Sequence, residues 1–207
     1  GRFVTDVLHR PGYANVHPEP AQDHPDGEFP TVRFPNPEED GAMDRSMALA
    51  RQVDADVVLA NDPDADRLAV GVPLGDGGYR LLSGNEIGCL LAYYLLTENP
   101  PSIGEPLVMT TIVRSRMLEA MAGELGAHYD ETLTGFKWIA NASQRHAREK
   151  GWRFVMGFEE ALGYTVGPVV ADKDGIGAAL LFTEIAAFCR ERSITVLDYL
   201  EEMIRRF

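Results

Sequence analysis

Three aspartates at alternating positions form the strongest chemical signal in this sequence. Asp62, Asp64 and Asp66 lie in the segment NDPDADR, directly after the apolar run ADVVLA. Carboxylates held this close repel one another unless a cation compensates them, and oxygen ligands without His or Cys favour Mg²⁺ over Zn²⁺. The alternative is a solvated acidic turn, but ligands of open α/β sheets bind where strands end. The sequence therefore predicts a Mg²⁺ site, and Arg67 stands where an EF-hand loop requires Gly.

Two further charged motifs could recognise a phosphorylated, hydroxyl-rich molecule. Arg67 could neutralise the aspartates in a structural ion pair, or bind a phosphate oxygen in bidentate fashion. Glu159 and Glu160 follow the apolar run RFVMGF, and carboxylates at a strand end can accept hydrogen bonds from sugar hydroxyls. Paired glutamates also commonly begin a helix, where its dipole favours them, and both interpretations remain open here.

Lys173 and the pair Thr134 and Gly135 complete the candidate site. Lys173 precedes a helix that begins with Gly, an arrangement suited to an anion, unless Asp172 and Asp174 simply pair with it as helix caps. Thr134 and Gly135 form a predicted turn after a strand in ETLTGFKWI, which is weak evidence by itself. The five histidines are scattered and no GxSxG occurs, so a nucleophilic triad finds little support.

The predicted helices and strands place these residues at strand ends and in loops. In the first part of the chain we predict a helix over 3–8, a strand near 14–17, a Pro-rich loop over 18–39, a helix over 43–53, a buried parallel strand over 55–60, and a hairpin of 68–74 and 79–82. In the second we predict a helix over 87–96 capped by Ser83 or Asn85, strands over 107–112, 127–132 and 153–159, and helices over 114–126, 138–151, 175–192 and 195–207.

This alternation predicts an α/β fold with two consecutive mixed or parallel-sheet domains, residues 1–81 and 82–207. Composition agrees with a folded chain of one or two domains, since 207 residues are 45% hydrophobic and 25% charged. The net charge of −13 argues against nucleic-acid or membrane-surface partners. Cys89 and Cys189 stand alone in apolar stretches, and we expect reduced thiols and a cytoplasmic location.

Four motifs in order, NDPDADR, TGFKW, GFEEALGY and DKDG, make this chain similar to the α-D-phosphohexomutases, the phosphoglucomutase and phosphomannomutase family. The segments DGEFPTVRFPNPEE and SGNEIGCLLAYYLL extend the resemblance over nearly the whole chain. Members of that family have four domains, and this chain resembles a truncated second domain followed by the third. The first domain's serine motif, T-(A/G)-S-H-N-P, does not occur in it. The resemblance thus implies a fragment that contacts the first and fourth domains of the same protein.

The resemblance also implies a role for each candidate residue. Asp62, Asp64 and Asp66 would bind Mg²⁺, Arg67 would lie beside the serine phosphate, Lys173 would lie near the reacting phosphate, and Thr134, Gly135, Glu159 and Glu160 would contact the sugar. Ala161 stands where many members have Ser, which removes one sugar contact.

The implied reaction is Mg²⁺-dependent phosphoryl transfer between the 1- and 6-positions of a hexose phosphate, through a phosphoserine and a hexose 1,6-bisphosphate intermediate or activator. Glucose, mannose, glucosamine and pentose phosphates all remain candidate substrates. One alternative is a haloacid-dehalogenase-like phosphatase, although Arg67 and Leu68 break its DxDx(T/V) pattern. Another is a fragment that binds metal and sugar phosphate without turnover, and we expect this fragment alone to be inactive.

Overall fold

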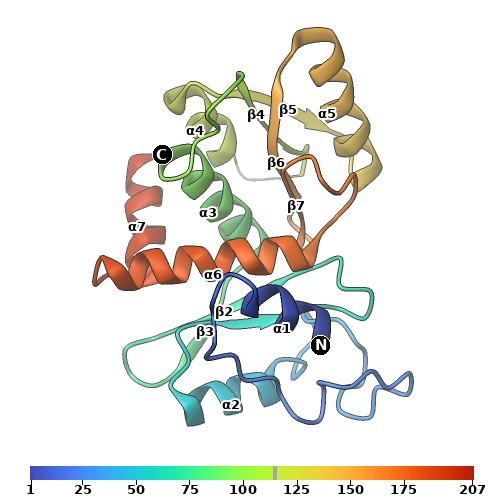
Figure 1. Ribbon diagram of the computed structural model, residues 1–207, viewed down its shortest axis with the longest axis vertical. Helices are drawn as coiled ribbons and strands as arrows, with labels where there is room; N and C mark the ends of the chain where they lie inside the picture. Colours follow the sequence, from blue (N-terminus) through green and yellow to red (C-terminus); the bar gives the residue numbers. More distant parts are fainter. Residues whose placement is uncertain (114–115) are drawn as a thin grey trace.

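The chain builds two β-sheets, one after the other along the sequence, with the long helix α6 (Gly175–Glu191) lying between them (Figure 1). The computed structural model describes residues 1–113 and 116–207. The first sheet is formed by residues 58–81 and the second by residues 106–166. The mixed α/β fold predicted from the sequence is therefore confirmed.

The first sheet is antiparallel and has the order β1-β2-β3, with β1 Val58–Ala60, β2 Ala69–Pro73 and β3 Tyr79–Leu81. The prediction of a parallel strand over 55–60 was wrong, because Val58 pairs antiparallel with Gly71. The reason is the short connection: residues 61–68 reverse the chain directly, whereas a parallel neighbour needs a crossover of a dozen or more residues. The aspartates lie in this reversal. The predicted β2–β3 hairpin is confirmed.

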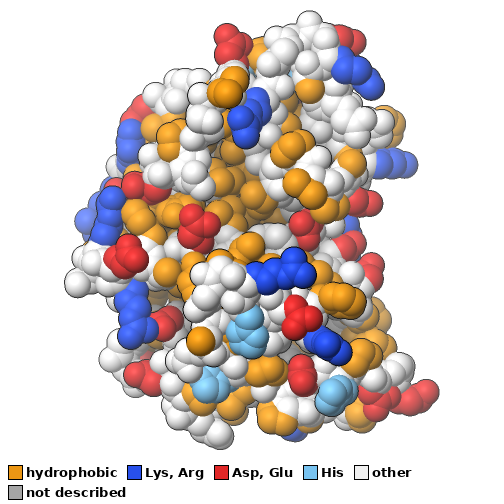
Figure 2. All heavy atoms as spheres, viewed as in Figure 1, with side chains coloured by type: hydrophobic (Ala, Val, Ile, Leu, Met, Phe, Trp, Pro, Cys, Tyr) orange, Lys and Arg blue, Asp and Glu red, His pale blue; other side chains and the backbone are white. Residues whose placement is uncertain are grey.

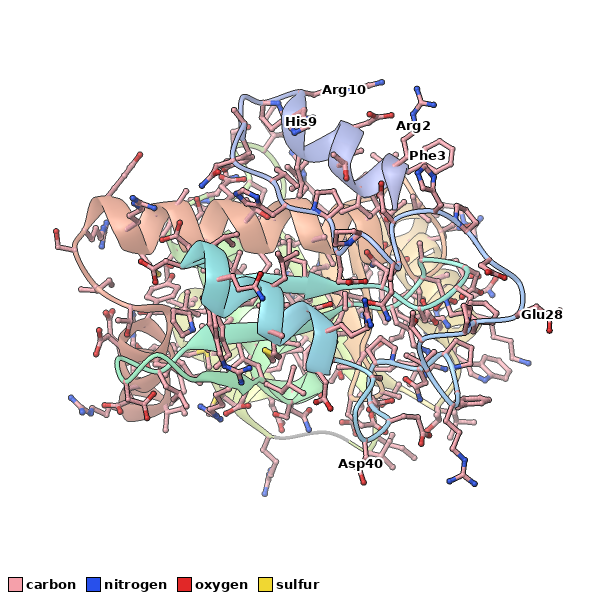
Figure 3. All side chains as sticks on the ribbon, turned by 90° about the horizontal axis from the view of Figure 1, so that it is seen from below. Arg2, Phe3, His9, Arg10, Glu28 and Asp40 are labelled. Atoms are coloured by element: carbon pink, nitrogen blue, oxygen red, sulfur yellow. The ribbon has the colours of Figure 1, made fainter. Side chains whose placement is uncertain are left out.

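Two helices and a long loop belong to the same part of the chain as the first sheet. Helix α1 (Arg2–His9) packs against α6 through its buried Leu8, and Figure 3 shows Arg2, Phe3, His9 and Arg10 directed away from the body of the molecule. Helix α2 (Asp44–Val53) packs on β1 with its buried Met47 and Ala50. Both helices agree with the predicted ranges. The Pro-rich segment between them is a loop, and Figure 3 shows its Glu28 and Asp40 at the outer margin of the molecule.

The strand predicted near residues 14–17 does not form. Residues 12–18 line the same cavity as β1, a space of about 550 Å³ that is also bordered by α1, α2 and α6. Because this cavity lies along both segments, the backbone of 14–17 has no ladder with β1, and a strand needs such a partner. None of the residues predicted from the sequence to form the site lines this cavity, although Asn61, immediately before the first aspartate, does.

The second sheet has the order β5-β4-β6-β7. Its strands are β4 Pro106–Thr111, β5 His128–Thr132, β6 Arg153–Glu159 and β7 Gly163–Val166. The first three are parallel, as predicted, and β7 is antiparallel to β6. Strand β7 was not predicted, because the segment LGYTVGP is short and flanked by glycines, which is typical of a loop. The tight turn between β6 and β7 presents Glu160.

Helices α3 (Gly84–Thr97), α4 (Met117–Leu125), α5 (Phe136–Lys150) and α6 pack on strands of this sheet, and α7 (Val196–Arg206) packs on α3 and α6. Their predicted positions are confirmed, except that residues 114–115 of the fourth helical range lie outside the described residues. Ser83 caps α3 in a capping box with Glu86, so Ser83 and not Asn85 is the N-cap. Helix α3 is buried on nearly all sides, in a hydrophobic core that extends from α2 to α7 and thus joins the two sheets.

One face of the molecule carries acidic, basic and hydrophobic side chains together. On the face shown in Figure 2, acidic and basic side chains alternate with hydrophobic ones, and no single class covers it. Both cysteines are buried and free. Among the described residues, no helix has the length and apolar character that a membrane span requires.

Candidate functional site

The reversal between β1 and β2 gathers the three aspartates. Each of Asp62, Asp64 and Asp66 offers a carboxylate oxygen, and these oxygens lie within 4.8 Å of one another. Ala65, between them, has a positive φ of 58°, a left-handed conformation that folds the loop back on itself. We call residues 61–67 the aspartate loop. The sequence prediction that alternating spacing would bring the carboxylates together is thus supported by the geometry.

Partial burial changes the ionisation of Asp62 in the aspartate loop. The pKa of Asp62 is raised above its usual value, mainly because the carboxyl is partly buried, and the negative charges of Asp66 and Asp64 act in the same direction. The backbone N–H of Arg67 donates a hydrogen bond to Asp62 Oδ1 at 3.1 Å and opposes this rise. The loop therefore holds its negative charge at an energetic cost, which a cation would relieve.

Arg67 provides part of the compensating charge. Its Nε lies 3.5 Å from Asp62 Oδ2 and 3.9 Å from Asp66 Oδ1. Its Nη1 lies 3.7 Å from Glu38 Oε2, in the Pro-rich loop. One third of the Arg67 side chain stays exposed, so the guanidinium can neutralise the aspartates and still meet a ligand. The two interpretations left open for Arg67 are therefore compatible.

Lys173 also reaches the aspartate loop. Its ammonium forms an ion pair with Asp66 Oδ2. The other oxygen, Oδ1, is buried and accepts no hydrogen bond among the described residues. The aliphatic part of Lys173 passes over Gly163, where a Cβ atom would come within 2.7 Å of Cδ. Glycine at this position therefore lets the lysine cross the β6–β7 turn to the aspartates.

The donor set of the aspartate loop fits a hard divalent cation. It offers carboxylate oxygens without His or Cys, the chemistry that Mg²⁺ prefers. A buried carboxylate oxygen without a hydrogen bond, such as Asp66 Oδ1, is costly unless a cation or donor meets it. Asp62, Asp64 and Asp66 are thus the residues that would hold Mg²⁺.

Glu159 ends β6 and faces the start of α5. Its Oε1 accepts a hydrogen bond of 2.6 Å from the backbone N–H of Gly135, the N-cap residue of α5. Gly135 has a φ of 118°, a conformation that side chains other than glycine rarely adopt. Thr134 is exposed on the loop immediately before it. Glu159 Oε2 would lie 3.8 Å from a Cβ at Gly163, the same residue that the Lys173 stem crosses, so the Thr134–Gly135 turn and the lysine both lie near this glycine.

Glu160 occupies a different environment. It does not begin a helix, since it lies in the turn between β6 and β7, and Thr111 Oγ1 donates a 3.3 Å hydrogen bond to its Oε2. Its backbone closely approaches α3, where a Cβ at Gly84 would lie 1.8 Å from the Glu160 carbonyl oxygen. The alternative interpretation of the paired glutamates as a helix start is therefore wrong.

Backbone contacts join the aspartate loop to the β6–β7 turn. Arg67 forms a β-bridge with Gly163, and the N–H of Leu68 donates to the Leu162 carbonyl at 3.0 Å. The two halves of the candidate site, one on each sheet, are therefore held at a fixed distance. We refer to the aspartate loop, Lys173, Glu159 and the Thr134–Gly135 turn together as the candidate site.

Sequence reasoning missed Glu38, Asn61 and Gly163. Glu38 lies in the NPEE segment of the Pro-rich loop, and nothing in the sequence indicated that it would pair with Arg67. Asn61 donates from Nδ2 to the Arg67 carbonyl oxygen at 2.6 Å. Its position immediately before the first aspartate was the available signal, because Asn and Asp commonly bond to the backbone of their own turn.

Family models match nearly all of the chain. Residues 1–75 match the model described as phosphoglucomutase/phosphomannomutase, alpha/beta/alpha domain II, and residues 83–207 match that of domain III. The sequence is 43% identical over 188 residues to phosphopentomutase of Mus musculus, and this match covers 87% of this chain and 30% of that protein. It is 40% identical over 211 residues to the probable phosphoribomutase of Schizosaccharomyces pombe, with 99% and 35% covered.

A third relative is the probable phosphomannomutase of Haemophilus influenzae, 40% identical over 205 residues, with 99% of this chain and 40% of that protein covered. The chain thus spans 30–40% of the length of these curated relatives. Its fold is like that of a putative phosphomannomutase from Thermus thermophilus, with a TM-score of 0.64, 22% identity, and coverage of 82% of this chain and 35% of the other. Parafusin, a phosphoglucomutase from Paramecium, also has a TM-score of 0.64, at 21% identity, with 84% and 30% covered.

Proposed function

The chain belongs to the phosphoglucomutase/phosphomannomutase family, and we propose that it forms the Mg²⁺-binding and sugar-binding parts of a phosphosugar mutase. The observation that carries this proposal is that Lys173 pairs with Asp66 in the aspartate loop, while its stem and the Glu159 carboxylate both lie near Gly163. Haloacid-dehalogenase-like phosphatases are a different family, so that alternative is dropped.

The residues divide into two groups by what they bind. Bound Mg²⁺, held by the aspartate loop, would offset negative charge on a phosphoryl group in transfer. Arg67 and Lys173 carry the positive side chains of the site and bind phosphate oxygens, Arg67 through its planar guanidinium and Lys173 as a point charge. Catalysis of phosphoryl transfer depends mainly on such positioning and electrostatic stabilisation.

Glu159 orients the sugar. Its carboxylate, fixed by the Gly135 N–H, accepts hydrogen bonds from two neighbouring ring hydroxyls, with Thr134 on the adjoining turn and Glu160 on the next residue as further contacts. Hydroxyls at the 3- and 4-positions occupy similar places when the ring is turned over. One carboxylate can therefore hold the sugar with either of its phosphate-bearing ends toward the aspartate loop, as a mutase requires.

The reaction we propose is transfer between the 1- and 6-positions of a hexose phosphate through a hexose 1,6-bisphosphate. Relatives named phosphopentomutase and phosphoribomutase support the 1- and 5-positions of a pentose phosphate equally well, so both sugars belong in the test. The phosphoryl donor is a serine in the T-(A/G)-S-H-N-P motif, which this sequence does not contain. The chain by itself therefore binds Mg²⁺ and sugar phosphate without turnover, and the first and fourth family domains are its partners.

The test measures binding and turnover on the same sample. Glucose 1-phosphate and ribose 5-phosphate are titrated calorimetrically into the chain with Mg²⁺, and ³¹P NMR follows any isomerisation. We expect binding of at least one sugar phosphate, about tenfold weaker in Glu159→Gln, because a hydrogen bond to a charged group contributes about 1.5–3 kcal/mol. Glu201→Gln, on the exposed face of α7, is the matched control and keeps the affinity of the unaltered chain.

Two results would contradict the proposal. Failure of every sugar phosphate to bind, with the chain folded, would remove the sugar site. Isomerisation by the chain alone would show that the phosphoserine domain is dispensable.

A further inference from the structure

Asn61 closes the aspartate loop at its base, and no role has been assigned to it so far. We propose that Asn61 is a positioning residue that holds Asp62, Asp64 and Asp66 in the arrangement that binds a divalent cation. This inference rests on the proposed function, because it deepens the description of the same metal site. It concerns the shape of the loop, and not a direct contact of Asn61 with the ion.

The hydrogen bond of Asn61 joins the two ends of the loop. Its side-chain Nδ2 donates to the carbonyl oxygen of Arg67 at 2.6 Å, across six residues. At the same end, the N–H of Arg67 donates to Asp62 Oδ1. The loop between these bonds contains a left-handed residue, Ala65, a conformation that persists only when the surrounding structure holds it. Asn61 provides that restraint from inside the loop.

Packing of α6 fixes the same bond from outside. Gly175 is the first residue of α6 and is buried against the loop. A Cβ atom at this position would lie 2.3 Å from the Arg67 carbonyl oxygen and 2.6 Å from Asn61 Nδ2, closer than real Cβ atoms come. The N-terminus of α6 therefore presses on both partners of the hydrogen bond. Asp174 anchors this end of the helix by accepting the Gly177 N–H at 2.9 Å.

The chemistry of the amide suits this position. A neutral Asn can donate to a carbonyl without bringing a further negative charge to three carboxylates, whereas Asp could not donate and would add one. Mg²⁺ demands near-ideal octahedral geometry, so small shifts of its ligands weaken binding. Groups that orient metal ligands through hydrogen bonds typically contribute about 10–100-fold to metal affinity. We expect a loss in this range when Asn61 can no longer donate.

The experiment titrates Mg²⁺ calorimetrically into the full chain carrying Asn61→Ala or Asn61→Leu, and records the EPR spectrum of bound Mn²⁺. Leu has as many side-chain heavy atoms as Asn but cannot donate a hydrogen bond, so its affinity decides the question if the Ala variant does not fold. The matched control is Asn141→Ala. Asn141 Nδ2 donates to the Lys137 carbonyl at 2.7 Å on the exposed side of α5, which is the same kind of bond in another place.

The inference predicts that both Asn61 variants keep their circular-dichroism spectrum but bind Mg²⁺ at least tenfold more weakly, with an altered Mn²⁺ spectrum, while Asn141→Ala binds normally. A folded Asn61 variant with the affinity of the unaltered chain would overturn the positioning role and leave the metal site standing. If the unaltered chain binds no Mg²⁺ at all, the metal site of the proposed function fails, and the role of Asn61 fails with it.

Discussion

Lys173 competes with a metal ion for Asp66, and replacing it by Met should therefore strengthen Mg²⁺ binding. The Lys173 ammonium pairs with Asp66 Oδ2, and the side chains of Lys173 and Asp66 are 21% and 25% exposed. A cation that binds the aspartate loop must displace this ammonium or be repelled by it. Methionine is also unbranched and can follow the same path over Gly163, but it carries no charge.

The magnitude follows from this burial. Two unit charges 4 Å apart interact by about 1 kcal/mol in water and about 4 kcal/mol at an effective dielectric constant of 20. Partial exposure and the flexibility of the lysine stem place the competition near the lower value, at about 1.4 kcal/mol, or about tenfold in Kd. Without metal the sign reverses, because Lys173→Met leaves the three carboxylates less compensated, and Tm should fall by about 2–4 °C.

Calorimetric titration of Mg²⁺ into chelator-treated protein, with melting curves in EDTA and in excess Mg²⁺, measures both effects. Lys150→Met is the control, since the Lys150 ammonium lies 3.9 Å from the ring centre of Trp152, just beyond the C-terminal end of α5. We expect Lys173→Met to bind Mg²⁺ about tenfold more tightly and to melt lower only in EDTA. Equal or weaker Mg²⁺ binding by folded Lys173→Met would refute the reasoning, because the lysine would then support the ion instead of competing with it.

Three further predictions concern packing and ionisation. Gly84→Ala should lower the free energy of unfolding by about 1–3 kcal/mol in urea titrations, because its Cβ would overlap the Glu160 carbonyl, while Gly123→Ala, which meets no atom within 4 Å, should be neutral or stabilising; equal effects would contradict the close approach. Burial raises the pKa of the Cys89 thiol to about 12, so the free energy of unfolding should fall as the pH rises above 9, where the unfolded chain releases this proton and the folded chain does not. Cys89→Ala should make this fall with pH less steep, and an equally steep fall in the variant would contradict the assignment to Cys89. The pKa of Asp62 is also raised, so metal-free protein should lose stability as the pH rises from about 4 through the folded pKa, and melting curves of Asp62→Asn should not show this loss.

Local patterns were sufficient to predict the aspartate loop. Three alternating carboxylates after an apolar strand lie within seven residues, so their grouping was predictable without any distant contact, although the antiparallel reversal of the chain there was not. The helices were predictable for the same reason, since capping and periodicity act within a few turns, as at Ser83.

Features that depend on tertiary packing could not be predicted in the same way. The direction of β1 depends on its partner, and the strand expected over 14–17 lacks a neighbour to pair with. The ion pair of Lys173 with Asp66 joins residues more than 100 positions apart, and it needs Gly163 between them. The place of Asn61 before the first aspartate indicated a side chain that bonds to its own turn, but its contact with the first residue of α6 depends on tertiary packing.

The most direct test of the central claim is a calorimetric titration of Mg²⁺ into the chain and into Asp64→Asn. Asp76→Asn is the control, because Asp76 also lies in an acidic turn, where it accepts the Gly78 N–H at 2.9 Å, between β2 and β3. The account predicts one Mg²⁺ per chain, lost in Asp64→Asn and kept in Asp76→Asn. Absence of binding by the unaltered chain, or equal binding by Asp64→Asn, would contradict it.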